Sequence, residues 1–207
     1  MNLKKQIRKE MTIDHLNVAI YEQPEVMADN ASDFVEKNIK EAINKTGFAN
    51  IILATGSSQL LFLEALRNKE IDWKKITVFH LDEYKDISPN HPASFRKYLK
   101  DRILSFVNPK KVYFLNGNAA DCEKEMRKYE QILINHPIDI ACIGIGENGH
   151  IAFNDPGEAD FNDRDQVKLV NLDEACRRQQ FTEGWFPSFD DVPRQALTLT
   201  IPAILNS

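Results

Sequence analysis

The stretch Ile51-Ile-Leu-Ala-Thr-Gly-Ser-Ser-Gln-Leu60 decides the fold of this chain of 207 residues. Residues 51–54 form a compact apolar run that predicts a buried strand, and residues 60–66 continue as a largely apolar helix. A polar turn that contains Gly56 connects the two. A strand, a short turn and a helix in this order are the repeating unit of a parallel sheet covered by helices.

The same alternation of strand and helix extends in both directions. Upstream, residues 18–21 predict a short strand, and apolar residues at helical spacing over 31–43 predict a helix that ends at Gly47. Downstream, the predicted elements are a strand at 76–79, a helix that begins near Pro92, a strand at 112–115, a helix at 122–133 and a strand at 138–143. We therefore expect a Rossmann-like α/β/α fold with a mostly parallel sheet.

Composition limits the class of protein. The formal net charge of -5 gives no basic footprint for nucleic acid, and no apolar run approaches the roughly 18 residues of a membrane span. Residues 1–10 are charged, which argues against a secretion signal. The three cysteines are too widely spaced for a zinc motif and indicate reduced thiols in a cytoplasmic protein. The oligomeric state, a homo-oligomer included, stays open.

The chain is most simply interpreted as one domain over residues 1–207. Residues 197–201 predict a further strand, and residues 202–205 begin a helix that stops within about one turn. We therefore expect the carboxyl-terminal elements of the domain to be missing.

Two polar segments follow predicted strands directly. Thr55, Gly56, Ser57 and Ser58 offer hydroxyls and backbone N–H groups at a helix start, which suits a phosphate, although a serine there can equally cap the helix. Asp82 follows the next strand, where burial raises the pKa of a carboxyl and suits it to take a proton from carbon.

Two alternatives remain open for the segment around Asp82. It can be a solvated turn that carries the adjacent acids Asp82 and Glu83, with Tyr84 as a packing anchor. A metal site built from His80, Asp82 and His91 is also open, but the spacing matches no compact ligand motif.

The densest polar segment is Gly144-Ile-Gly-Glu-Asn-Gly-His-Ile-Ala-Phe-Asn-Asp-Pro156. Its glycines match a dinucleotide-binding pattern, but that pattern should open a helix, and here a turn signal follows. We therefore expect Gly146 and Gly149 to let the backbone pass close to a small ligand. His150, with Asp155 nearby, is an acid–base candidate, although a lone histidine is more often structural.

With these segments together, the chain closely resembles the glucosamine-6-phosphate deaminase (isomerase) family, which shares its fold with the 6-phosphogluconolactonases. The matching blocks occur in family order and are Leu53-Ala-Thr-Gly-Ser-Ser57, Phe79-His-Leu-Asp-Glu-Tyr84, His91-Pro-Ala-Ser94, Leu115-Asn-Gly-Asn118, residues 144–156 and Val192-Pro-Arg-Gln-Ala-Leu-Thr198. Lactonases typically carry Asp-Glu-Arg where this chain has Asp82-Glu-Tyr84. The resemblance therefore favours the deaminase branch.

The resemblance implies conversion of glucosamine 6-phosphate and water to fructose 6-phosphate and ammonia, with no metal or organic cofactor. In this mapping Asp82 moves the proton between carbons 1 and 2, and His150 assists ring opening. Asn148 and Asp155 orient His150, and Asn148 lacks the charge of the aspartate that some members have there. The phosphate is held by the Thr55 to Ser58 turn, and Arg178 is the candidate for the arginine that the family supplies.

Three other functions remain open. A related substrate, galactosamine 6-phosphate or 6-phosphogluconolactone, would need the same kind of site. A non-catalytic sugar-phosphate sensor would not need Asp82. An inactive relic would have lost phosphate contacts together with its last elements.

Overall fold

The protein is described by a computed structural model over residues 7–206. Residues 1–6 of the charged start, which we considered for a secretion signal, lie outside the described residues, as does residue 207. The helices and strands alternate along most of the chain, and they form one central parallel sheet, a smaller antiparallel sheet and an amino-terminal hairpin.

The central sheet has four parallel strands in the order β6-β4-β3-β7. Their bounds are Lys111–Tyr113 for β6, Ile76–His80 for β4, Ala49–Leu53 for β3 and Ile140–Cys142 for β7. Each overlaps a predicted strand, so the expectation of a parallel sheet is confirmed. Their carboxyl ends meet at one edge, which is where ligands bind in open α/β sheets.

Helices cover both faces of this sheet. They are α1 (Pro24–Thr46) and α2 (Leu60–Arg67) on one face, and α5 (Cys122–Ile134) and α7 (Ile201–Leu205) on the other. Alternate strand residues divide between the two cores: Ile51 packs with the α1 and α2 side chains, and Ile52 with those of α5 and α7. The three-layer architecture follows from strands that are apolar on both sides. Helix α1 ends at Gly47, as predicted.

The second sheet was not predicted. It is antiparallel, with the order β5-β9-β8, and its strands span Asp82–Tyr84, Gln195–Leu199 and Val167–Asn171. The predicted strand at 197–201 is therefore β9, but it runs antiparallel to its neighbours and ends at Leu199. Only Leu81 separates β4 from β5, so the second sheet begins where the central sheet ends.

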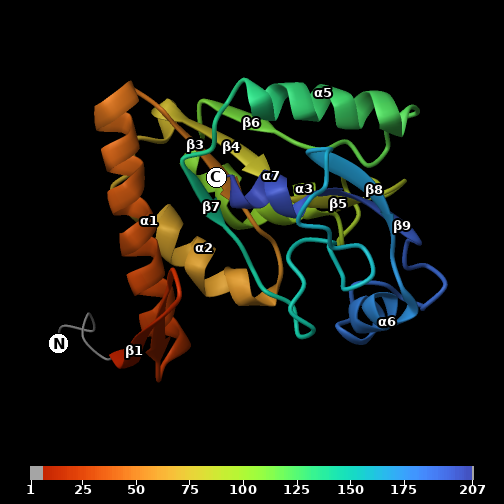
Figure 1. The fold of residues 1–207 in the computed structure, drawn as a ribbon, viewed down its shortest axis with the longest axis horizontal. Coiled ribbons are helices and arrows are strands. Elements are labelled where there is room, and N and C mark those ends of the chain that lie inside the picture. The colour runs from red at the N-terminus through yellow and green to blue at the C-terminus, as the bar shows by residue number, and fades with distance from the viewer. Residues whose placement is uncertain (1–6, 207) are drawn as a thin grey trace.

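Two other predictions need correction. The strand predicted at 18–21 is part of β2 (Leu16–Tyr21), which pairs with β1 (Ile7–Ile13) in a hairpin beside α1 and not with the central sheet. This hairpin lies at the opposite end of the molecule from α6 (Glu174–Thr182), as Figure 1 shows.

The helix predicted from Pro92 begins instead at α3 (Phe95–Leu99). The side chain of Ser94 accepts a hydrogen bond from the Lys97 N–H and so fixes this start. The helical path continues through a π-helical turn at Lys100–Leu104 into α4 (Ser105–Val107). Within residues 7–206 no helix combines the length and the apolar character that crossing a membrane requires.

Candidate active site

A cavity of about 270 Å³ opens at the carboxyl ends of the central strands. Segments that follow β3, β4 and β7 contribute to its wall, together with residues from the α3 and α6 regions. The predicted site residues that line it are Thr55, Gly56, Ser57, Ser58, Asp82, Gly146 and His150. Thr55 and His150, which are 95 residues apart in the sequence, thus converge on one pocket, as the parallel topology requires.

The Thr55 to Ser58 turn connects β3 to a short 3₁₀ helix, Ser57–Gln59, that leads into α2. Gly56 has φ 111° and ψ 167°, a backbone conformation that residues with a Cβ rarely adopt. Its carbonyl oxygen accepts a 2.7 Å hydrogen bond from the hydroxyl of Tyr98. No serine side chain caps either helix, so the capping alternative is wrong, and both serines are exposed at the cavity.

Asp82 is a buried carboxyl at the cavity wall, with 8% of its surface exposed. Burial raises its pKa to about 8, and the neighbouring charge of Glu83 acts in the same direction, while His150 opposes both. A carboxyl in this range exchanges protons near neutral pH. The alternative of a solvated turn is wrong, because Glu83 also is fully buried.

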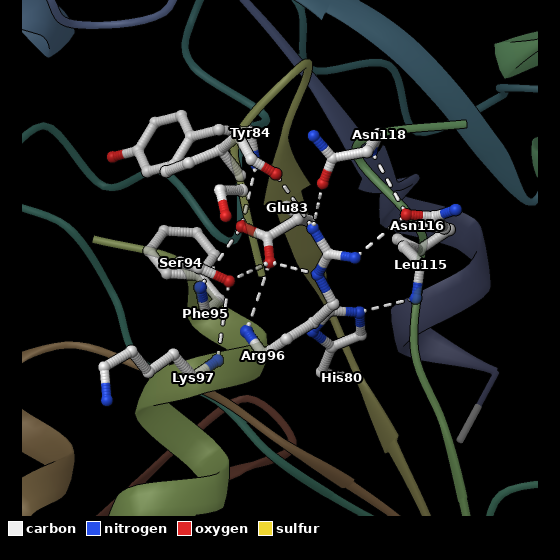
Figure 2. Close-up of polar contacts among 12 residues, drawn as sticks. His80, Glu83, Tyr84, Ser94, Phe95, Arg96, Lys97, Leu115, Asn116 and Asn118 are labelled. Carbon is white, nitrogen blue, oxygen red and sulfur yellow. Dashed lines mark hydrogen bonds and ion pairs between the residues drawn. The ribbon is translucent and has the colours of Figure 1, made fainter. Parts of the chain in front are cut away.

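The Glu83 carboxylate points away from the cavity into a network of buried hydrogen bonds, shown in Figure 2. It receives hydrogen bonds from the backbone N–H groups of Tyr84, Phe95 and Arg96 and from the Ser94 hydroxyl. Arg96 Nε lies 2.9 Å from Glu83 Oε2. The ion pair ties β5, and with it Asp82, to the start of α3.

The same guanidinium reaches the loop that follows β6. It donates to Asn116 Oδ1 and Asn118 Oδ1, both at 2.9 Å, and to the carbonyl oxygen of Ile87. Four of the five N–H donors of Arg96 therefore have protein acceptors, which suits a buried cation.

The metal alternative at this site is not supported. His80 Nε2 accepts a 2.7 Å hydrogen bond from the Leu115 N–H, and burial lowers the His80 pKa to about 3, with the Arg96 charge adding to it. The His91 ring stacks on Phe186 instead, and its Nδ1 accepts from the Ala93 N–H. In the described part of the chain no group of three His, Cys, Asp or Glu side chains is arranged to hold a metal ion.

His150 is fixed by two side chains from its own loop. Its Nδ1 lies 2.6 Å from Asn148 Oδ1 and 3.3 Å from Asp155 Oδ1, and the Asn148 amide donates to Asp155 at 2.9 Å. Because both oxygens are acceptors, Nδ1 carries the proton and Nε2 is the atom free to exchange one. Asn148 and Asp155 do not line the cavity themselves.

The charge at His150 is set mainly by Asp155. A hydrogen bond to that carboxylate raises the His150 pKa, burial opposes this, and the negative charges of Asp155 and Asp82 raise it further. The same contact lowers the pKa of Asp155. Asp155 thus supplies the negative charge that Asn148 lacks. The absence of an aspartate at position 148 therefore does not leave His150 without a charged partner.

The glycines of this loop serve the histidine. A Cβ on Gly146 would lie 2.1 Å from His150 Cε1, so only glycine leaves room for the ring. The Gly146 N–H donates to the His150 carbonyl and the Gly149 N–H to the Gly146 carbonyl. Gly149, with φ 86°, forms the turn but does not line the cavity. No helix opens at the third glycine, as we expected when rejecting the dinucleotide pattern.

Among the predicted site residues that do not line the cavity, Arg178 alone lies outside the His150 loop. It is exposed on α6, and its side chain forms an ion pair with Glu174 one turn earlier. The cavity is lined instead by residues that no motif indicated, namely Tyr98, Gln179, Gln180, Glu183 and Trp185. The sequence signal for two of them was the adjacent pair of glutamines. The sequence favoured the preceding arginine instead, because a positive charge is expected of a residue that binds phosphate.

Most of this chain matches a known protein family. The family described as glucosamine-6-phosphate isomerases and 6-phosphogluconolactonase matches residues 22–207. A glucosamine-6-phosphate deaminase of Bacillus cereus is 32% identical over 192 residues, which are 93% of this chain and 70% of that protein. A deaminase of Bacillus thuringiensis shows the same identity and coverage.

Solved structures extend the similarity to the fold. A monomeric glucosamine-6-phosphate deaminase of the NagB superfamily matches with a TM-score of 0.78 and 34% identity, over 89% of this chain and 76% of that one. A 6-phosphogluconolactonase from Shewanella baltica matches with a TM-score of 0.72 and 20% identity, over 90% and 76% of the two chains. The second likeness is one of fold alone.

Proposed function

Because the chain belongs to the family of glucosamine-6-phosphate isomerases and 6-phosphogluconolactonases, we propose that it converts glucosamine 6-phosphate and water to fructose 6-phosphate and ammonia. The observation that carries this proposal is one cavity faced by a buried carboxyl, Asp82, and by a histidine, His150, whose Nδ1 is occupied by acceptors. Relatives named glucosamine-6-phosphate deaminase, at 32% identity, support this choice of reaction.

Ring opening needs a group that moves a proton between the anomeric hydroxyl and the ring oxygen. In this proposal His150 Nε2 accepts the hydroxyl proton, and the resulting imidazolium returns it to the ring oxygen. Asp155 stabilises the imidazolium through its 3.3 Å contact with Nδ1. Asn148 keeps the ring in place by its 2.6 Å contact. The product is the open-chain aldehyde.

Isomerisation then needs a base that can both take and return a proton. Ionised Asp82 removes the proton from carbon 2 while the aldehyde oxygen gains a proton from the substrate's ammonium group, which gives an enolamine, and protonated Asp82 then delivers its proton to carbon 1. Water adds to the resulting imine at carbon 2, and ammonia leaves. A carboxyl whose pKa is raised to about 8 by burial is matched to both halves of this transfer.

The phosphate of the substrate is placed in the Thr55 to Ser58 turn. The turn presents hydroxyls and backbone N–H groups at the start of the 3₁₀ helix and α2, and it takes no part in bond breaking. Binding there would position the reacting carbons between Asp82 and His150, and such positioning by a remote group lowers the barrier. We further propose a cytoplasmic location, which the three free cysteines support.

The proposal is tested with purified protein and glucosamine 6-phosphate, by measuring ammonia and fructose 6-phosphate. Both products are expected in equal amounts, and Asp82→Asn should abolish their formation. Galactosamine 6-phosphate and 6-phosphogluconolactone, given in parallel, identify a related activity. Turnover of either in place of glucosamine 6-phosphate, or binding of sugar phosphates without any turnover, contradicts the proposal.

A further inference from the structure

Helix α6 carries the run Arg177-Arg-Gln-Gln180 past the cavity, and its four side chains take three different directions. Arg177 is buried and donates to the carbonyl oxygens of Val192 and Phe189, so it holds the following loop. Arg178 is exposed and pairs with Glu174. Gln179 and Gln180 line the cavity. The two cations of the run are therefore turned away from the ligand, and the two carboxamides face it.

The described side chains that line the cavity include carboxyl groups but no lysine or arginine, which makes the two carboxamides important as hydrogen-bond donors. Its carboxyl and imidazole side chains are Asp82, Glu147, Glu183 and His150, and no lysine or arginine of the described chain lines it. Oxygen atoms of a ligand must then find neutral donors, which are hydroxyls, backbone N–H groups and side-chain amides.

The amide of Gln180 is oriented by Tyr84. The Tyr84 hydroxyl, on a fully buried ring, donates to Gln180 Oε1 at 2.8 Å. The reverse orientation would leave the Tyr84 proton without this acceptor, and an unsatisfied buried donor is costly. Gln180 Oε1 is therefore occupied, and the two protons on Nε2 are available to a ligand.

Tyr84 also fixes where along the cavity this donor lies. Asp82 and Tyr84 are two residues apart on β5, so their side chains leave the same face of the strand. Glu83, between them, points to the opposite side, into the Arg96 network of Figure 2. Gln180 thus belongs to the Asp82 end of the cavity and not to the Thr55 to Ser58 turn.

Resting on the proposed function, we propose that Gln180 Nε2 donates a hydrogen bond to an oxygen of the sugar next to the carbons that react. Gln180 is a substrate-binding residue, and Tyr84 is the positioning residue that holds its amide. Arg178, which the sequence favours as a ligand to the substrate, has no part in binding.

The test measures the Kd of fructose 6-phosphate by calorimetry for the wild type and for variants of α6. Gln180→Ala should raise Kd about 5- to 10-fold, the effect of one lost hydrogen bond. Gln180→Glu should raise it further, because the carboxylate still accepts from Tyr84 but has no donor for the sugar. Arg178→Ala, two residues away on the same helix, is the matched control and should leave Kd within twofold of wild type.

A double-mutant cycle separates positioning from a general structural effect. Tyr84→Phe should weaken binding in the wild-type background and have no effect in Gln180→Ala, since Tyr84 acts through that amide alone. Circular dichroism confirms that each variant is folded. A Kd for Gln180→Ala within twofold of wild type, or a larger effect of Arg178→Ala, overturns the inference.

Different measurements test the role of Gln180 and the proposed function. If the wild type binds fructose 6-phosphate but does not deaminate glucosamine 6-phosphate, the proposed function is lost while the Kd ratios still decide the role of Gln180. If folded wild type binds no sugar phosphate, both are overturned.

Discussion

Gly146 and the His150 ring are so close that only a glycine at position 146 leaves room for the ring. A methyl group at 146 would lie 2.1 Å from the imidazole, and the three nearest atoms that it would meet all belong to that ring. The ring would have to leave its contacts with Asn148 and Asp155. At this scale, one missing Cβ determines whether the acid–base group faces the ligand.

We therefore expect Gly146→Ala to lower kcat/KM for glucosamine 6-phosphate by at least about 100-fold, the range that a lost general acid–base group accounts for. Gly157→Ala in the same loop region is the matched control, because a Cβ there meets nothing within 4 Å. It should keep wild-type activity. Equal activity of Gly146→Ala and the control, measured by ammonia release, would show that the ring position is not limiting.

Asp82 predicts the pH dependence. As the base it must be ionised, and its pKa is raised to about 8 by burial and by Glu83. The rate measured as kcat/KM should therefore rise with pH through an acid limb centred near 8, and Asp82→Asn should remove the activity. An acid limb near 4, the ordinary value for a carboxyl, would contradict the assigned environment of Asp82.

The same shift has a consequence for stability. A carboxyl whose folded pKa lies above its unfolded value favours the folded state at low pH, and this contribution is lost as pH rises from about 4 through about 8. Asp82→Asn avoids the buried charge, so its stability relative to wild type should increase over this window. At pH 9 we expect a Tm at least about 3 °C above wild type. A lower Tm for Asp82→Asn at pH 9 would contradict the burial cost.

The sequence indicated Asp82 because it follows an apolar strand, and His150 because it lies among glycines. Both signals are local in the sequence. It did not indicate Gln180, Glu183 or Tyr98, because a residue on a helix reaches the cavity only through tertiary packing. It favoured Arg178 on charge, whereas the direction of a side chain on α6 depends on which helix face is buried, and that face carries Cys176 and Arg177.

Strand β5 and helix α3 are held together by the ion pair of Glu83 and Arg96, which is the main polar link between elements near the site. Glu83 receives five hydrogen bonds, counting the Arg96 Nε contact. A buried pair of this kind stabilises little relative to apolar residues, but its disruption leaves a buried charge without a partner.

Arg96→Met should therefore lower the free energy of unfolding by about 3 to 5 kcal/mol, the cost of an unpaired buried carboxylate. Arg127→Met, which removes an exposed pair with Glu123 on α5, should change it by less than about 1 kcal/mol. Urea unfolding of both variants measures the difference. Similar values for the two would mean that the Glu83 network does not hold β5 to α3.

Element prediction succeeded for strands that are buried on both faces and for a long helix with one apolar face. Strands β3 and β4 and helix α1 carry long apolar patterns that only one element type fits. It failed for β1 and β8, in which exposed and partly exposed residues predominate, and for the direction of β9. Pairing partners and strand direction are non-local, so a short apolar run does not reveal them.

At the scale of the molecule, the parallel sheet brings the three strand ends and α6 to one cavity, while the amino-terminal hairpin lies at the other end (Figure 1). The chain spans 70% of the length of its Bacillus cereus relative. The expectation that carboxyl-terminal elements are missing stays a prediction. The site residues from Thr55 to Trp185 are nevertheless all within the described chain.

The central claim is that Asp82 and His150 act on glucosamine 6-phosphate in this cavity. The most direct measurement is a single-substrate assay in deuterium oxide, in which fructose 6-phosphate is analysed by NMR for deuterium at carbon 1. We expect ammonia and fructose 6-phosphate in equal amounts for wild type and no product for Asp82→Asn. Protium at carbon 1 marks direct transfer from carbon 2 by Asp82, and deuterium marks exchange of the Asp82 proton with solvent before delivery. Undiminished product formation by Asp82→Asn, or no product from folded wild type, would contradict the account.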